Sequence, residues 1–153
     1  MNKKIFIIYT ADNCGACSKF KRTQSVLVEN IRKIKNISIL YINVKKMADD
    51  PGELYHPQFR KGGKWFPGFY LFDEEDFYNF ENPLNGHVMG GIYKNGIQTK
   101  DPSIKYSFQT SYIIEWIKYN ISIKQKSKIK YIYNNDDTDF EYYTLDWYKL
   151  MNK

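Results

Sequence analysis

Cysteine is scarce in this sequence: the 153 residues contain two, Cys14 and Cys17. A small secreted domain held together by disulfides needs a larger even number of cysteines, so that class of protein is excluded. Histidine is equally scarce, with His56 and His87 both expected in surface loops. A zinc site would need all four of these residues, and their spacing fits no closed zinc pattern. We therefore predict no metal and no cofactor, with zinc as the less favoured alternative.

Long hydrophobic runs are also absent. No stretch approaches the roughly 20 apolar residues that span a bilayer. The apolar run 5–9 follows Lys3 and Lys4, as in a signal peptide, but it is too short and no small-residue cleavage site follows it. We predict no membrane association and a cytoplasmic location. A virion location is the alternative if the source is a virus, because the Ile, Asn, Lys and Tyr bias is typical of AT-rich genomes.

A single block of basic residues is also absent from the chain. The formal net charge is +6, but the basic residues are mostly lysines spread along the sequence. A nucleic-acid-binding protein would show a basic patch or a recognition motif, and the sequence has neither. We therefore predict no nucleic-acid partner. Hydrophobic residues make up 42% and aromatic residues 18%, so a disordered chain is excluded as well.

The N-terminal part of the chain carries a β-α-β pattern. Residues 4–9 are a continuous apolar run, typical of a strand buried on both faces. From Cys14 to Asn36 apolar residues recur at helical spacing, which predicts one helix over 14–36. Residues 37–44 are rich in β-formers and predict a second strand, parallel to the first.

The remaining patterns continue a mixed α/β domain. We predict a short helix within 47–55, a third strand at 69–72, an acidic and aromatic insertion at 73–86, a fourth strand at 87–93, a turn at 94–96, and a final helix from Thr110 or Ser111 to about Ser122. A chain of this length can bury a substantial core. The domain is expected to span 1–122, and 123–153 is expected to be a C-terminal extension that docks on it or mediates a homodimer.

Cys14-Gly15-Ala16-Cys17 is the motif that carries chemistry. A disulfide across two residues constrains almost no loop, so a catalytic or metal-binding role is favoured over a structural one. At the start of a helix, the Cys14 thiolate would be stabilised by unpaired backbone N–H groups. Cys17 would lie one turn further on, on the same face and more buried. Gly15 and Ala16 are small enough to leave the two sulfurs within bonding reach.

The order of these elements resembles the thioredoxin and glutaredoxin superfamily over about residues 4–122. The specific resemblance lies in the Cys14–Cys17 motif, which Asn13 precedes, and in Phe66-Pro67 before the third strand. It implies an α/β, thioredoxin-like fold with a central mixed sheet of about four strands flanked by helices. It also implies a cis peptide bond before Pro67 and backbone groups of Phe66 that pair with the substrate.

The same resemblance implies a thiol–disulfide oxidoreductase that acts on protein thiols and disulfides and is recycled by glutathione or a reductase. A cluster-bridged dimer, which some glutaredoxins form, and a cis bond at Pro57 are less favoured alternatives. Thioredoxins carry a buried Asp where this chain has Ile8, Trp where it has Asn13, and Pro where it has Ala16. The missing acid favours a rival hypothesis, a thioredoxin-fold binding or structural module that keeps the cysteine pair without using it.

Overall fold

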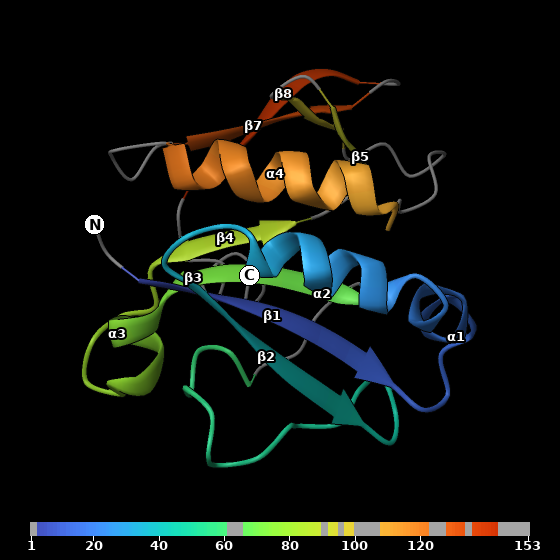
Figure 1. Cartoon of the computed structure of the whole chain (residues 1–153). Helices are drawn as coiled ribbons and strands as arrows, with labels where there is room; N and C mark the ends of the chain where they lie inside the picture. The colour runs from blue at the N-terminus through green and yellow to red at the C-terminus, as the bar shows by residue number, and fades with distance from the viewer. Residues whose placement is uncertain are drawn as a thin grey trace.

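A four-stranded mixed sheet forms the centre of the protein (Figure 1). The computed structural model describes residues 3–60, 66–89, 92–94, 97–99, 108–122, 128–133 and 136–143. The strands lie in the order β2-β1-β3-β4, with bounds β1 Lys4–Ala11, β2 Ile37–Val44, β3 Gly68–Asp73 and β4 Gly86–Met89. β1 is parallel to β2, and β3 is antiparallel to β1 and β4. The predicted mixed α/β architecture, a sheet flanked by helices, is confirmed.

The parallel pair β1–β2 positions the cysteine motif. The two strands pair over their whole length, from Lys4 opposite Ile37 to Ala11 opposite Val44. Every residue of β1 after Lys4 is buried, as expected for a central strand that is covered on both faces. Because parallel strands end at the same edge of a sheet, the chain segments that follow β1 and β2 meet there.

Helices cover one face of this sheet. Their bounds are α1 Gly15–Lys21, α2 Gln24–Arg32 and α4 Thr110–Ser122, and α2 lies beside α4 (Figure 1). The core beneath them contains Phe6, Ile8, Leu27 and Trp116, all at most 2% exposed. α4 has the bounds that its capping and apolar pattern predicted.

The helix predicted over 14–36 is interrupted. Arg22 and Thr23 separate α1 from α2, and the two helix axes point in different directions (Figure 1). The Thr23 hydroxyl donates to the Phe20 carbonyl oxygen at 3.1 Å, and the Thr23 N–H donates to the same oxygen at 2.9 Å. A side chain that bonds back to the preceding turn in this way competes with the helical hydrogen bonds.

An irregular segment, residues 45–60, lies against the opposite face. The helix predicted within 47–55 is wrong, because turns and extended residues occupy these positions. The segment is held instead by individual side chains, chiefly by the buried His56. The Gln58 N–H donates to His56 Nδ1 at 3.1 Å, so Nε2 carries the proton and donates to the Asn82 carbonyl oxygen at 2.7 Å.

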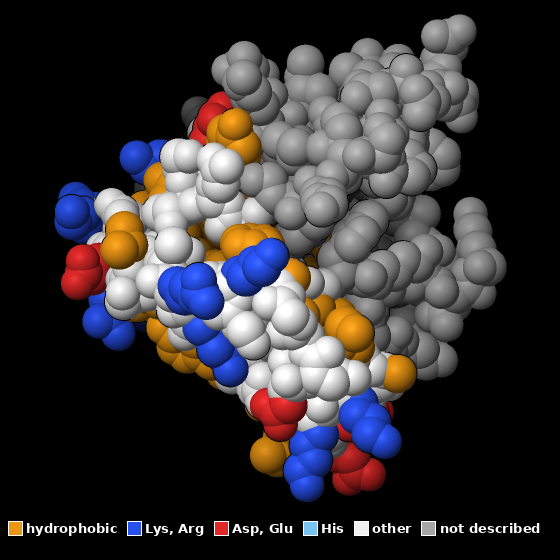
Figure 2. Space-filling model, turned by 90° about the vertical axis from the view of Figure 1, so that its right-hand side faces the viewer, with side chains coloured by type: hydrophobic (Ala, Val, Ile, Leu, Met, Phe, Trp, Pro, Cys, Tyr) orange, Lys and Arg blue, Asp and Glu red, His pale blue; other side chains and the backbone are white. Residues whose placement is uncertain are grey.

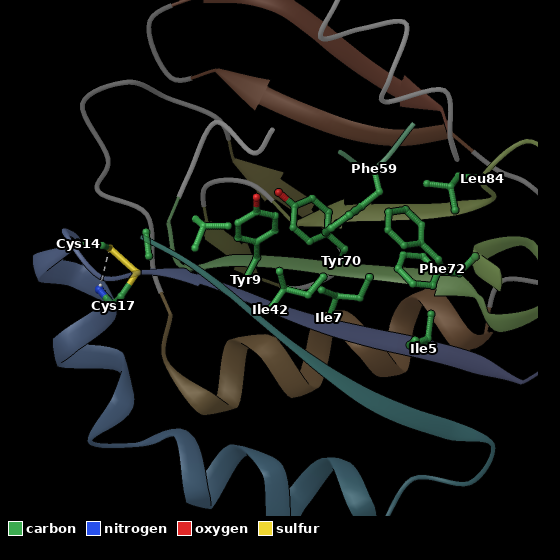
Figure 3. Packing of buried hydrophobic residues seen from close by; sticks show 13 residues of the cluster. Ile5, Ile7, Tyr9, Cys14, Cys17, Ile42, Phe59, Tyr70, Phe72 and Leu84 are labelled. Carbon is green, nitrogen blue, oxygen red and sulfur yellow. Dashed lines mark hydrogen bonds between the residues drawn. A yellow bond between two sulfur atoms is a disulfide. The ribbon is translucent and has the colours of Figure 1, made fainter. Parts of the chain in front are cut away.

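Aromatic rings fill the core between this segment and the sheet (Figure 3). Phe59 lies at its centre, with its ring centroid 5.5 Å from that of Tyr9, 5.2 Å from Tyr70 and 5.7 Å from Phe77. These separations are in the range of favourable aromatic pairs. The two cysteines lie at one end of the same cluster (Figure 3). The acidic 73–86 insertion begins with the short helix α3 Glu74–Tyr78, which contributes Phe77 to this core.

Both histidines are buried, so the prediction that they lie in surface loops is wrong. His56 is 2% exposed and His87 6% exposed. His87 lies on β4 opposite Leu71, in the sheet rather than in a loop. Burial, with a smaller contribution from the charge of Lys4, lowers the pKa of His87 to about 3. The ring is therefore neutral at pH 7.

A second four-stranded sheet lies beside α4 (Figure 1). Its order is β5-β6-β7-β8, with bounds β5 Ile92–Lys94, β6 Ile97–Thr99, β7 Lys128–Tyr133 and β8 Asp136–Tyr143. The fourth strand predicted at 87–93 is therefore divided: β4 ends at Met89 and β5 belongs to the other sheet. β5 and β6 are antiparallel on either side of the predicted turn, whose residues 95 and 96 lie outside the described residues.

Two strands of the predicted C-terminal extension belong to this second sheet. β7 pairs in parallel with β6 and antiparallel with β8. The remaining parts of the extension, 123–127, 134–135 and 144–153, lie outside the described residues. Within the described part of the chain, no helix combines the length and apolarity that crossing a bilayer requires.

Candidate functional site

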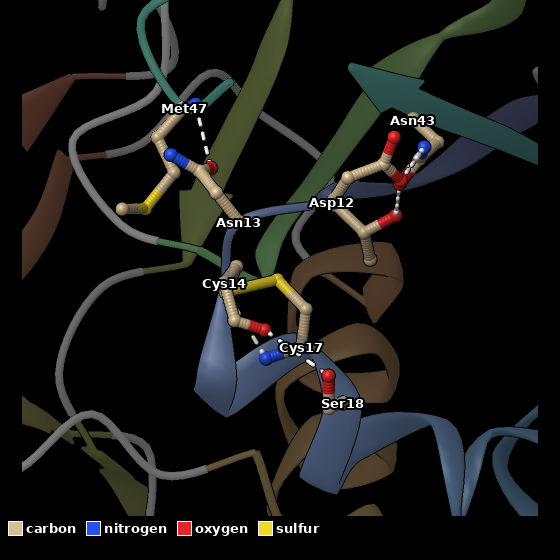
Figure 4. The surroundings of a disulfide bond; sticks show 8 residues. Asp12, Asn13, Cys14, Cys17, Ser18, Asn43 and Met47 are labelled. Atoms are coloured by element: carbon tan, nitrogen blue, oxygen red, sulfur yellow. Dashed lines mark hydrogen bonds between the residues drawn. A yellow bond between two sulfur atoms is a disulfide. The ribbon is translucent and has the colours of Figure 1, made fainter. Parts of the chain in front are cut away.

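Cys14 and Cys17 are joined by a disulfide at the start of α1 (Figure 4). Cys14 is the N-cap residue, with an extended backbone (φ −117°, ψ 110°), and Cys17 lies in the first turn of the helix. Their Cα atoms are 5.2 Å apart, within the usual range for a disulfide. The predicted placement of the pair, one cysteine at the helix start and the other a turn further on, is confirmed.

The two sulfurs have different surroundings. The Cys17 N–H donates a hydrogen bond to Cys14 Sγ at 3.0 Å, as an N-cap side chain commonly accepts one. Cys14 is 6% exposed and Cys17 is 1% exposed. Between them, Gly15 is exposed and Ala16 packs against the aromatic core. Cys14 is thus the more accessible residue of the pair, and its sulfur has a backbone donor that would also stabilise a thiolate.

The turn that carries Cys14 is bonded to the end of β2. The Asp12 N–H donates to the Val44 carbonyl oxygen at 2.9 Å. Asn43 Nδ2 donates to Asp12 Oδ1 at 2.8 Å, and the buried Thr10 hydroxyl donates to Asn43 Oδ1 at 2.7 Å (Figure 4). These three bonds fix the β1–α1 turn to the neighbouring strand, and sequence analysis did not identify them. The β-α-β pattern was the sequence feature that could have predicted them, because it brings the ends of β1 and β2 together.

Asn13, predicted as a residue flanking the motif, has a defined structural contact. Its side-chain Oδ1 accepts a hydrogen bond from the Met47 N–H at 3.1 Å (Figure 4). The Asn13 side chain therefore joins the residue that directly precedes Cys14 to the loop that follows β2. Met47 was not predicted as a site residue.

The Phe66–Pro67 peptide bond is cis and directly precedes β3. Phe66 packs against the cluster that contains both cysteines, and its ring lies edge-on to Tyr9 with the centroids 5.1 Å apart. Pro67 is buried. The cis bond predicted at Pro67 is confirmed, and no other cis peptide bond, at Pro57 or elsewhere, occurs in the described segments.

The core that contains the cysteines includes the phenols of Tyr9 and Tyr70. Burial, aided by the nearby carboxylates Asp50 and Asp49, raises the pKa of Tyr9 to about 12, and burial also raises the pKa of Tyr70. Both phenols stay protonated at neutral pH. Ile8 is buried at 2% exposure in the core beneath the helices, so this position offers no carboxylate.

No metal site accompanies the cysteines in the part of the chain that the structure describes. His56 is occupied by its bonds to Gln58 and Asn82. His87 lies in β4 on the face that the helices cover, because its partner Leu71 belongs to that core. The histidines therefore do not join the cysteines in one ligand set.

No protein-family model, curated protein or solved structure matches this chain. The site is therefore assessed from its own geometry.

Proposed function

We propose that this protein is a thiol–disulfide oxidoreductase and a divergent member of the thioredoxin-like superfamily. The observation that carries the proposal is the Cys14–Cys17 disulfide at a helix start, where a backbone N–H donates to the more accessible sulfur. Two further features support it: the order β2-β1-β3-β4 of the central sheet and the cis Phe66–Pro67 bond before β3. A structural disulfide of this spacing would add little stability.

The reaction divides into two exchanges. In the reduced enzyme, the Cys14 thiolate attacks one sulfur of a substrate disulfide, forms a mixed disulfide and releases the first substrate thiolate, which takes up a proton. Cys17 then loses its proton, attacks Cys14 Sγ, forms the Cys14–Cys17 disulfide and releases the second substrate thiol. Two electrons pass from the enzyme to the substrate; one of the two protons that the substrate thiols take up comes from Cys17 and the other from solvent. An external thiol, such as glutathione or the dithiol of a reductase, reverses these steps on the enzyme.

Among the described residues, no carboxylate or imidazole makes a hydrogen bond with Cys17 that could serve the second exchange. Ile8 replaces the buried acid of thioredoxins, and Tyr9 does not serve as a base because its pKa is raised to about 12. Cys17 is 1% exposed, so its proton must leave through a local opening or through the substrate. We therefore propose that resolution of the mixed disulfide limits the rate.

A reduction assay with insulin and dithiothreitol tests the proposal. Cys14→Ser should lower turnover to the uncatalysed background, and Cys17→Ser should accumulate a mixed disulfide that mass spectrometry detects. Ser25→Ala, at an exposed position of α2, is the control and should retain activity. Turnover that does not depend on Cys14 would reject the enzymatic function.

The second candidate is a binding or structural module that retains the thioredoxin-like fold. The absence of an acid at Ile8 favours it. This candidate predicts that Cys14→Ser leaves stability and partner binding unchanged while wild-type protein shows no turnover above background. The insulin assay therefore separates the two.

A further inference from the structure

The loop that follows β2 is bonded to the cysteine turn at two points. The Val44 carbonyl oxygen accepts from the Asp12 N–H at 2.9 Å, and the Met47 N–H donates to Asn13 Oδ1 at 3.1 Å. We call residues 44–49 the β2 shelf. Because Asp12 and Asn13 directly precede Cys14, the shelf has a defined position beside the turn that carries Cys14 (Figure 4).

The shelf is also closed by bonds of its own. The Lys46 N–H donates to Asp49 Oδ2 at 3.1 Å, and the Asp49 N–H donates to the Lys46 carbonyl oxygen at 3.0 Å. The Tyr9 hydroxyl donates to the Asp49 carbonyl oxygen at 3.3 Å, which ties the turn to the aromatic core. The shelf is therefore a preorganised surface, which binds a partner at a smaller entropic cost than a free loop.

Met47 presents an apolar side chain on this surface. Its backbone N–H makes the bond to Asn13, and its side chain is 43% exposed. An unbranched thioether adapts to partners of different shape, and methionine is enriched at surfaces that bind varied peptides. A substitution of the Met47 side chain would leave the backbone bond to Asn13 in place.

The charge of the shelf is positive. Lys45 and Lys46 are both exposed, and neither makes an ion pair with another described residue. The nearby carboxylates keep their charge: Asp49 accepts from the Lys46 N–H, so residues 44–49 carry two positive charges and one negative charge. Asp50, just beyond the shelf, accepts from the Gly52 N–H at 2.8 Å and forms an ion pair with Arg60 at 4.0 Å. Figure 2 shows the face that contains α1 and the ends of β1 and β2: Lys and Arg side chains lie across its middle, and Lys, Arg, Asp and Glu side chains lie together towards the bottom.

We propose that the β2 shelf determines substrate specificity: it selects polypeptide cysteines that have an apolar neighbour and an acidic residue beyond it. The apolar neighbour contacts Met47, and the acidic residue lies near Lys45 and Lys46. This inference rests on the proposed oxidoreductase function and adds the substrate class to it. Glutathione offers carboxylates but no apolar side chain beside its cysteine, so it is the poorer substrate.

Short peptides test the two contacts separately. Each peptide carries one cysteine in a mixed disulfide with 2-nitro-5-thiobenzoate, flanked by Leu and Asp, by Ser and Asp, or by Leu and Lys. The enzyme, reduced beforehand with dithiothreitol, releases the coloured thiolate. We expect the second-order rate constant of this single turnover in the wild type to be about tenfold higher for the Leu–Asp peptide than for the Leu–Lys peptide at low salt, and this ratio to fall as salt screens the charges.

Variants of the shelf should change these ratios selectively. Lys45→Glu/Lys46→Glu should remove or reverse the preference for Asp over Lys. Its matched control, Lys33→Glu/Lys35→Glu, makes the same change in net charge at exposed positions before β2 and should leave the preference intact. Met47→Ser should remove a preference of about threefold to tenfold for Leu over Ser, whereas Leu54→Ser, which changes an 88% exposed side chain of the same segment, should not.

Three results would overturn the inference. The preference for Asp could be lost equally in the control double variant, which would make it an effect of net charge alone. The Leu preference could survive in Met47→Ser. The glutathione mixed disulfide could react faster than the Leu–Asp peptide. Turnover of any of these substrates that still depends on Cys14 would leave the proposed function standing, whereas turnover absent in the wild type would reject both.

Discussion

The two faces of the central sheet are covered in different ways. Helices α1, α2 and α4 cover one face, and the irregular segment 45–60 covers the face that holds the disulfide. A helix satisfies its own backbone groups, so an apolar stripe is enough to place it. An irregular segment must find a partner for each polar group. Here the Tyr9 hydroxyl and the His56 ring pair with backbone groups of the segment, and the His56 and Gln58 side chains bond it to the backbone of Asn82 and Leu84. The disulfide face therefore depends on a few individual side chains.

The largest expected loss of stability comes from removing the central aromatic side chain on either face of the sheet. Phe59→Ala and Trp116→Ala should each lower the free energy of unfolding by about 3–5 kcal/mol, because each removes a fully buried aromatic side chain. Urea denaturation measures both losses. Hydrogen exchange should distinguish them: Phe59→Ala should release residues 45–60, and Trp116→Ala should leave that segment protected. Equal exchange in the two variants would show that the faces are not independent.

Substitution of His56 tests whether individual hydrogen bonds hold the segment 45–60 against the sheet. His56→Ala leaves the Asn82 carbonyl oxygen and the Gln58 N–H without their partner, at a cost of about 2–3 kcal/mol in unfolding free energy. Limited proteolysis should then cut within 45–60. His56→Gln keeps one donor and one acceptor and should recover part of the loss. A fully stable alanine variant would contradict the assignment.

His87 makes the helical face sensitive to acid. Its pKa of about 3 in the folded protein lies below the unfolded value near 6.5, so the unfolded state binds the extra proton. This contribution to stability is complete above pH 6.5 and is lost as the pH falls towards 3. We expect a loss of about 2 kcal/mol between pH 7 and pH 5. His87→Leu should flatten this part of the pH profile, and an unchanged slope would exclude His87 as its cause.

The smallest expected change in stability comes from substituting Gly15, which lies between the two cysteines in the sequence. A Cβ added at Gly15 would meet no atom within 4 Å, and the residue begins α1. Gly15→Ala should therefore leave the structure intact and raise the unfolding free energy by roughly 0.5–1 kcal/mol. Thermal unfolding of the oxidised protein measures it. A clear destabilisation would mean that the motif needs glycine for its backbone conformation.

Local sequence patterns predicted much of the framework and of the motif. The apolar runs identified β1, β2 and β3, helical spacing identified α4, and Cys-X-X-Cys placed the disulfide at a helix start. These features depend on neighbouring residues along the chain. The break at Thr23 and the path of 45–60 were mispredicted, because hydrogen bonds of single side chains override the periodicity there.

The sequence alone determined where the first three strands of the central sheet lie, where helix α4 lies and which pair of sulfurs can form a disulfide, because periodicity and close spacing act over a few residues. The tertiary structure decided that the fourth predicted strand divides between two sheets and that Met47 lies beside the turn of Cys14. These outcomes depend on segments that are distant along the chain and meet only when the sheet has formed, so no local pattern encodes them.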